Sequence, residues 1–98
     1  MKPYQYINPG DLITPRGPDG AEVELVDGSD FVWVDPGELV LVVEAGWAQE
    51  LEEDELDFVD QCAEVLIIGT FGNETIQIDD LNTKELERRW KIVSRPHV

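Results

Sequence analysis

The side chains that could do chemistry in this sequence are mainly carboxylates, 22 Asp and Glu in 98 residues. Two carboxylates can act as general acid and general base when an enclosed cleft sets their protonation states apart. Acidic residues occur in nearly every segment here, so no pair is marked out by its spacing. A domain of this size rarely encloses such a cleft, and we therefore expect no hydrolytic centre.

The other residue types that catalysis needs are scarce. His97 is the only histidine and lies one residue from the C-terminus, where chain ends are poorly held, so a Ser-His-Asp or Cys-His arrangement is not expected. Cys62 is the only cysteine, and the charged groups near it are Asp60 and Glu64, which do not favour a thiolate. Residues 69–72 lack the lysine of a phosphate loop, and a tight hairpin explains their glycines. The sequence predicts a protein that is not an enzyme.

Oxygen-rich segments raise the question of a metal site. Residues 27–30 and 52–55 are rich in carboxylates. Neither follows the twelve-residue calcium loop, with Gly at its sixth position and Glu at its twelfth, and no set of Cys and His could bind zinc. We expect a hairpin turn at 27–30, a solvated run of charge at 52–55, and no metal or other cofactor.

The charge balance is the strongest single signal in the chain. The formal net charge is -15, and five of the seven basic residues lie in residues 84–98. A surface this acidic repels nucleic-acid phosphates and anionic membranes and attracts basic protein surfaces. We expect no nucleic acid and no membrane as partner, but a protein with a basic surface. The basic patch is expected to neutralise part of the protein's own acidic surface, and it consists of Arg88, Arg89, Lys91 and Arg95.

Length and composition favour one folded domain over residues 1–98. The hydrophobic fraction is 42%, and three Trp and three Phe supply material for a core. A single cysteine excludes an internal disulfide, and no apolar run is long enough to span a bilayer. Because the N-terminus also lacks the apolar region of a signal peptide, we expect a cytoplasmic protein.

Turn residues and apolar patterns divide most of the chain into strands. Residues 38–44 and 63–69 are almost continuously apolar and β-branched, which is typical of central strands covered on both faces. A tight turn at 71–74 predicts a hairpin between 64–70 and 75–79. Further strands are expected at 11–14, 22–26, 31–34 and 90–94, and one or two helical turns at 81–89.

Residues 50–60 differ from the rest, because seven of these eleven residues are acidic. Two charges 4 Å apart repel by about 1 kcal/mol in water, which opposes a helix. Leu51, Phe58 and Cys62 nevertheless fall at helical spacing. A loop and a short docked helix both remain open for this segment.

In this order the elements resemble an SH3-like small β-barrel. The resemblance implies a mainly β, antiparallel barrel with the 22–34 hairpin as an enlarged first loop and one helical turn before the last strand. The aromatic residues with which SH3 domains bind proline-rich peptides find no match, since Tyr4 and Tyr6 precede the first strand and Trp47 ends the second. We therefore carry over the fold and not that ligand. In this assignment the first three strands would be residues 9–13, 38–44 and 64–70. The distal hairpin would be residues 71–74, the helix residues 81–89, and the last strand residues 90–93.

The Pro-Gly-Asp opening at residues 9–11 and the acidic surface are also similar to those of small bacteriophage accessory proteins. That likeness would place the chain in the host cytoplasm or in a virion. The oligomeric state stays open.

Three hypotheses for function follow from these patterns. The first is a non-enzymatic protein–protein interaction module, as a phage structural or accessory protein would be. Aromatic residues left exposed beside carboxylates would form its binding surface. The alternative is an acidic inhibitor that imitates a nucleic acid and blocks a DNA- or RNA-binding host protein. In the third, acidity only keeps the protein soluble at high salt. The candidate binding residues are Trp33, Trp47, Glu50, Glu52, Glu53, Asp54, Glu55 and Asp57.

Overall fold

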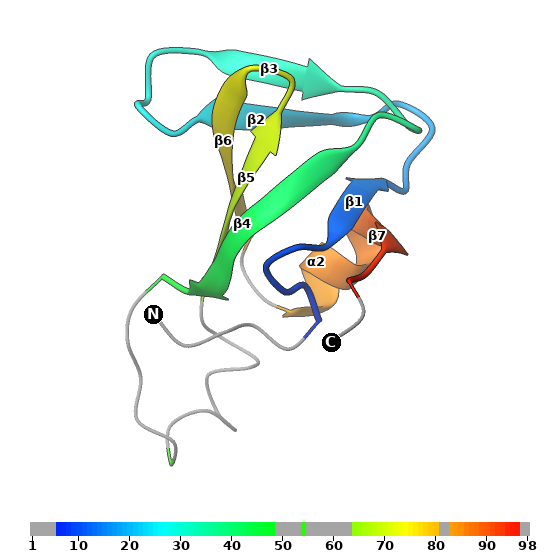
Figure 1. Cartoon of the computed structure of the whole chain (residues 1–98), viewed down its shortest axis with the longest axis vertical. Helices are drawn as coiled ribbons and strands as arrows, with labels where there is room; N and C mark the ends of the chain where they lie inside the picture. Colours follow the sequence, from blue (N-terminus) through cyan, green and yellow to red (C-terminus); the bar gives the residue numbers. More distant parts are fainter. Residues whose placement is uncertain (1–5, 49–53, 55–63, 81–82, 97–98) are drawn as a thin grey trace.

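The computed structural model describes residues 6–48, 54, 64–80 and 83–96 of the chain. These residues form a mainly β fold with one short helix near the C-terminus, as the sequence predicts (Figure 1). No helix in these ranges is long and apolar enough to cross a membrane. In chain order the elements are β1 (Leu12–Pro15), β2 (Ala21–Leu25), β3 (Phe31–Val34), β4 (Val40–Trp47), β5 (Val65–Phe71), β6 (Glu74–Asp80), α2 (Thr83–Arg89) and β7 (Trp90–Ser94).

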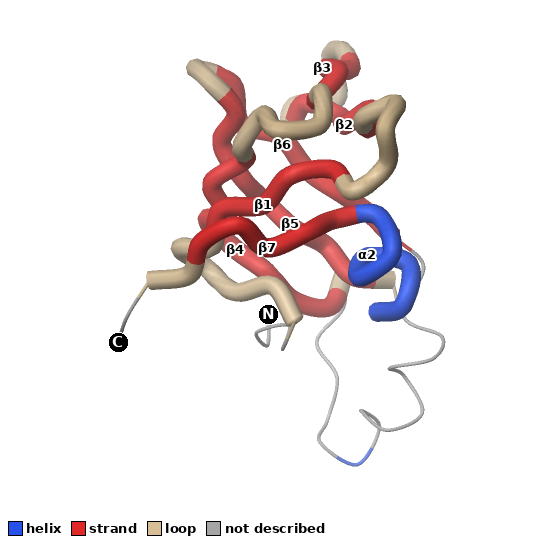
Figure 2. The backbone as a smooth tube through the Cα atoms, turned by 90° about the vertical axis from the view of Figure 1, so that its right-hand side faces the viewer, coloured by secondary structure: helices blue, strands red, loops and turns tan. Residues whose placement is uncertain are grey.

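The seven strands form one antiparallel sheet in the order β3-β2-β6-β5-β4-β1-β7. This sheet curls into a half-barrel, and α2 lies beside β7 at one end of it (Figure 2). The predicted hairpin is confirmed, because β5 pairs with β6 over the whole length of both strands. Its turn contains Gly72 with a φ of 62°, a conformation that glycine adopts without steric cost. The β2–β3 hairpin extends the sheet at the opposite edge from β7.

The core lies on the concave side of the half-barrel. The side chains that point to this side form the core, and Val40, Val65 and Ile67 among them are fully buried. Leu86 of α2 and Trp90 at the start of β7 cover the open end, at 0% and 2% exposure. Burying a side chain of this kind contributes roughly 1.5–3 kcal/mol, so these layers dominate the stability of the fold.

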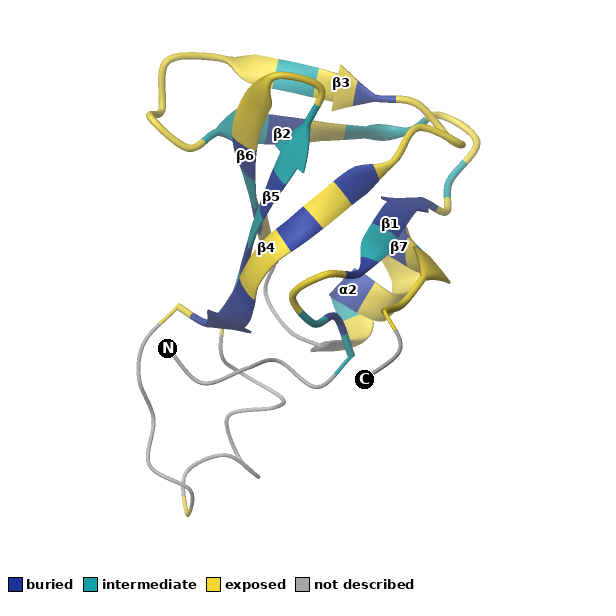
Figure 3. Ribbon diagram, viewed as in Figure 1, coloured by how far each residue is buried: buried dark blue, intermediate teal, exposed yellow. Residues whose placement is uncertain are grey.

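The expectation that residues 38–44 are covered on both faces is wrong. Strand β4 begins at Val40 and alternates as far as Val43, with Val42 buried while Leu41 and Val43 are 43% and 49% exposed (Figure 3). The register shifts between Val42 and Glu44, and Glu44 is exposed as well. A half-barrel is a single layer, and no element in the described part of the chain covers its convex side. The apolar run therefore supplies both a buried face and an exposed apolar stripe.

Gly69 allows close packing of two strands and is not part of the 71–74 turn. Gly69 lies inside β5 on the concave side, opposite Val42. A Cβ there would stand 2.7 Å from Val40 Cγ1 and 2.9 Å from the Leu41 carbonyl oxygen. The missing side chain lets β4 approach β5, and the hairpin explanation for this residue is corrected accordingly.

Candidate binding site

The β2–β3 hairpin presents two aromatic side chains to solvent. Phe31 and Trp33 are 60% and 51% exposed. They lie two positions apart on β3 and therefore share a face of the sheet. Their cross-strand neighbours on β2 are Glu24 and Glu22, respectively. We call these four residues the aromatic face; it combines large apolar rings with carboxylates.

A glycine at the start of β2 makes room for the Trp33 side chain. A Cβ on Gly20 would approach the indole Nε1 to 2.9 Å and the Val34 carbonyl oxygen to 2.4 Å. Gly20 also has a φ of 78°, which residues with a Cβ rarely adopt. The indole Nε1 therefore lies close to the backbone just before β2, where only glycine leaves room for it.

The free edge of β3 is partly blocked by carboxylates. The Leu25 amide donates to the Asp30 carbonyl, so positions 31, 33 and 35 direct their backbone groups away from β2. The Phe31 amide donates to Asp30 Oδ1 at 2.8 Å, and the Asp35 amide donates to Glu38 Oε1 at 2.9 Å. Capping of edge amides hinders edge-to-edge pairing. The side chains of the aromatic face, more than the strand edge, are therefore available for binding.

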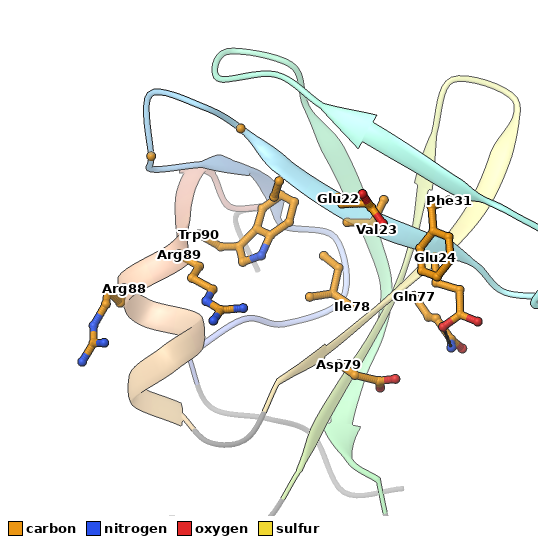
Figure 4. A pocket seen from close by; sticks show the side chains of 13 residues that line it. Glu22, Val23, Glu24, Phe31, Gln77, Ile78, Asp79, Arg88, Arg89 and Trp90 are labelled. Carbon is orange, nitrogen blue, oxygen red and sulfur yellow. Dashed lines mark hydrogen bonds between the residues drawn. The ribbon is translucent and has the colours of Figure 1, made fainter.

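Next to the aromatic face, β2 and β6 diverge and leave a pocket. The two strands pair only at Glu24↔Gln77 and Leu25↔Ile76, although both continue beyond these pairs. The pocket that opens there extends to α2 and the start of β7 and measures about 550 Å³, within the range of ligand sites. We call it the β2–β6 wedge, and Figure 4 shows the side chains around it. Its lining includes Val23, Glu24, Phe31, Ile78, Asp79, Arg89 and Trp90.

One wall of the wedge is acidic. The Gln77 amide Nε2 donates to the Glu24 carboxylate at 3.2 Å and holds it in place. Partial burial raises the pKa of Asp79, and the negative charges of Glu64 and Glu24 raise it further. Carboxylates from β2 and β6 and from the residue before β5 thus act on one another here, which makes this wall favourable for a cation.

The opposite wall carries the cations at the end of α2. The guanidinium of Arg88 lies 3.0 Å from Glu85, and that of Arg89 lies 3.7 Å from the same carboxylate. Figure 4 shows Arg89 directed toward the wedge and Arg88 directed away from it. Two of the four cations that were expected to neutralise the protein's own acidic surface thus share the single carboxylate of Glu85, so the three side chains together carry a net positive charge. The wedge is therefore bipolar, with its acidic wall on the strands and its basic wall on the helix.

Two side chains near the N-terminus hold the helical wall in place. The backbone amide of Arg16 donates to the Arg89 carbonyl at 2.8 Å, and its Nε donates to the carbonyls of Glu87 at 2.7 Å and Trp90 at 3.1 Å. The Tyr6 hydroxyl donates to the same Trp90 carbonyl at 3.1 Å. Carbonyls at a helix C-terminus have no partner inside the helix, so these bonds cap α2. Nothing in the sequence links residue 16 to residue 87, and sequence reasoning missed this role.

The residues proposed for binding from the sequence lie in different environments in the structure. Trp33 lies on the aromatic face, and Asp54 is exposed. Trp47 is 7% exposed and belongs to the core, because it ends β4 on the concave side opposite Val65. Its proposed contact with a partner is corrected. The remaining candidates lie outside the described residues, and they are Glu50, Glu52, Glu53, Glu55 and Asp57. The choice between loop and helix at 50–60 also lies outside the described residues.

Sequence reasoning also missed Phe31, Glu22, Glu24 and Asp79. The signal for Phe31 was present, because period-two alternation from Trp33 places it on the same face. Glu22 and Glu24 also alternate, on the strand that the predicted 22–34 hairpin sets beside Trp33. The wedge had no such signal, since it depends on where the β2–β6 ladder stops.

No group of three or more His, Cys, Asp and Glu within the described ranges is placed to hold a metal ion. Comparisons with protein-family models, with curated proteins and with solved structures find no match for this chain.

Proposed function

We propose that the protein is a non-enzymatic module that binds a partner protein through its aromatic face. The observation that supports this is the joint exposure of Phe31 and Trp33 beside the carboxylates of Glu22 and Glu24. Aromatic rings bury large areas when a partner covers them, and exposed tryptophans are over-represented among interface residues that dominate affinity.

The charge around the aromatic face selects the chemistry of the partner. The turns that flank it contain Asp27, Asp30, Asp35 and Glu38, and no basic residue lies between Arg16 and Lys84. Carboxylates around an apolar centre steer basic surfaces toward it and repel acidic ones. The expected partner is a protein that presents lysine or arginine around an apolar patch, and nucleic acid is disfavoured.

We also propose that the half-barrel is SH3-like. In this assignment β1, β4, β5, β6 and β7 are the barrel strands, and the β2–β3 hairpin is the enlarged first loop. The position of α2 directly before β7 supports the assignment. A binding face on the first loop and a strongly acidic surface also suit an accessory or structural protein of a bacteriophage, which we propose as the setting.

Partner capture with matched variants tests the proposed function. The immobilised chain is exposed to a lysate of the organism that encodes it, and retained proteins are identified and purified. Trp33→Ser removes an exposed side chain from β3, and Val93→Ser removes one from β7. The exposed fractions of the two residues are nearly equal, 51% and 50%. We expect Trp33→Ser to lose the partner and Val93→Ser to retain it, with both variants folded by circular dichroism. Equal retention by the two variants would refute the aromatic face.

A further inference from the structure

We propose that the β2–β6 wedge is a pocket for an arginine side chain carried by an extended segment of the partner. This inference rests on the proposed function and deepens it, because it names the group that the acidic surface selects. The wedge adjoins the aromatic face through Glu22, Glu24 and Phe31, which belong to both.

The face of the wedge that carries the carboxylates matches the two parts of an arginine side chain. The methylene stem can lie against the Phe31 ring, which is 60% exposed and shares this face with Glu24. Val23, Ile78 and Trp90, in contrast, close the wedge on the buried side of the sheet. Glu24 and Asp79 offer carboxylates to the guanidinium, and the Glu24 carboxylate is already oriented by Gln77. A planar guanidinium can bind two carboxylate oxygens at once, which the compact ammonium of lysine cannot do.

An aromatic ring adds to this match. Phe31 lines the wedge from β3, on the same side as Glu24 (Figure 4). A guanidinium near an aromatic face gains a cation–π attraction, with arginine the more frequent partner. The ring and the two carboxylates thus favour the same occupant.

The basic wall fixes the direction of the occupant. Arg89 points toward the wedge from the end of α2, so a second cation on that side is repelled (Figure 4). An extended segment would therefore direct its arginine to the strands and a neutral or acidic residue to the helix. The specificity of the wedge for such a segment comes from the opposite charges of its two walls.

The backbone at the wedge suits an extended segment. The last pair before the strands part is Glu24↔Gln77, and in a continuous ladder Glu22 would face Asp79. Alternation along the ladder directs the amide and carbonyl groups of these two residues into the wedge. A partner segment can hydrogen-bond to such groups, as peptides do when they extend a sheet.

Nuclear magnetic resonance of the full-length ¹⁵N-labelled chain tests the pocket with two small probes. N-acetyl-arginine amide and N-acetyl-citrulline amide have nearly the same shape, but only the first is charged. We expect the arginine probe to shift the amides of Gln77, Ile78 and Asp79 and the Trp90 indole saturably, and to bind about tenfold more tightly than the citrulline probe. Equal affinity for both probes, or shifts that map to another surface, would overturn the proposal.

Two substitutions on β6 make the test specific. Asp79→Asn removes charge from the acidic wall, whereas Glu74→Gln removes the same charge at the far end of the same strand, where Glu74 is exposed. Asp79→Asn should weaken the arginine probe about tenfold and Glu74→Gln should leave it unchanged; identical behaviour of the two variants contradicts an arginine pocket.

The probe experiment and the capture experiment fail separately. If Trp33→Ser loses the partner while the arginine probe does not bind, the module stands and the arginine pocket falls. If the probe binds while Trp33→Ser keeps the partner, the pocket stands and the aromatic face falls.

Discussion

Arg95 forms a two-pronged ion pair with Asp11 that joins the two ends of the described chain. Its Nε lies 3.0 Å from Asp11 Oδ1 and its Nη2 lies 2.9 Å from Oδ2. The Asp11 side chain is fully buried, whereas that of Arg95 is 48% exposed. The Asn8 amide donates to the same carboxylate at 2.9 Å, and Arg95 also donates to the Tyr6 carbonyl. Breaking this pair would leave a buried charge without its partner.

Asp11→Asn removes the buried charge and leaves Arg95, which is half-exposed and can be solvated, so we expect a loss of about 1.5–3 kcal/mol from the weakened hydrogen bonds to this side chain. Arg95→Lys keeps the charge but loses the two-pronged geometry, so we expect a smaller loss of about 1 kcal/mol. Urea unfolding of both variants measures the difference. Equal stability of Asp11→Asn and the wild type would show that the pair is not needed.

The same pair predicts how stability depends on acid. Burial by itself would raise the pKa of Asp11, but the Arg95 hydrogen bonds, the Asn8 amide and the Arg95 charge together lower it. A carboxyl with a lowered folded pKa stabilises the fold above its unfolded value and loses that contribution as pH falls further. We expect the wild type to lose stability below pH 3.8, the ordinary value, more steeply than Asp11→Asn. Parallel pH profiles of unfolding would contradict this role.

Asp79 should show the opposite dependence. Its pKa is raised by partial burial and by Glu64 and Glu24, so its ionised form opposes folding at neutral pH. Asp79→Asn should therefore stabilise the protein at pH 7, by less than about 1 kcal/mol because solvent screens exposed charges. The gain should vanish below pH 3.8, where the wild-type carboxyl is protonated in both states. A constant gain at every pH would point to packing instead of charge.

Gly20→Ala should be strongly destabilising. The new Cβ would lie 2.4 Å from the Val34 carbonyl oxygen, and the φ of 78° is unfavourable for alanine. Together the strain and the clash should cost about 2 kcal/mol or more, and they should displace the Trp33 indole. Thermal unfolding measures the first effect and tryptophan fluorescence the second. Gly17→Ala is the control, because a Cβ there meets no atom within 4 Å.

The capped edge of β3 predicts a change of oligomeric state. Asp30→Ala combined with Glu38→Ala frees the amides of Phe31 and Asp35, which these carboxylates now bind. An edge with free amides and exposed aromatic side chains is prone to pair with a second copy. Size-exclusion chromatography with light scattering should show self-association that increases with concentration. The control, Asp19→Ala with Glu44→Ala, removes the same charge elsewhere and should elute as the wild type does.

Much of the fold could be predicted because it depends on local patterns. Turn residues at 27–30 and 71–74 mark both hairpins, and alternation or apolar runs mark the strands between them. The apolar run at 38–44 misled because composition does not reveal which faces are covered. An exposed Leu41 and a buried Val42 look alike in sequence, and only the single-layered sheet distinguishes them.

The candidate site was less predictable because it depends on contacts between distant residues. Trp33 and Trp47 are each surrounded by apolar and acidic residues, yet one lies on an edge strand and the other in the core. The wedge arises where the β2–β6 ladder ends, which no local pattern marks. Arg95 and Asp11 are 84 residues apart, so their pairing could not be read from spacing.

The affinity of the captured partner for the wild type and for Trp33→Ser, at about 50 and about 500 mM NaCl, tests the binding module most directly. The aromatic face predicts that Trp33→Ser weakens binding by about tenfold or more, while tenfold more salt has a modest effect on the wild type. An unchanged affinity for Trp33→Ser, together with a steep loss at high salt, would contradict the module and support imitation of a nucleic acid instead.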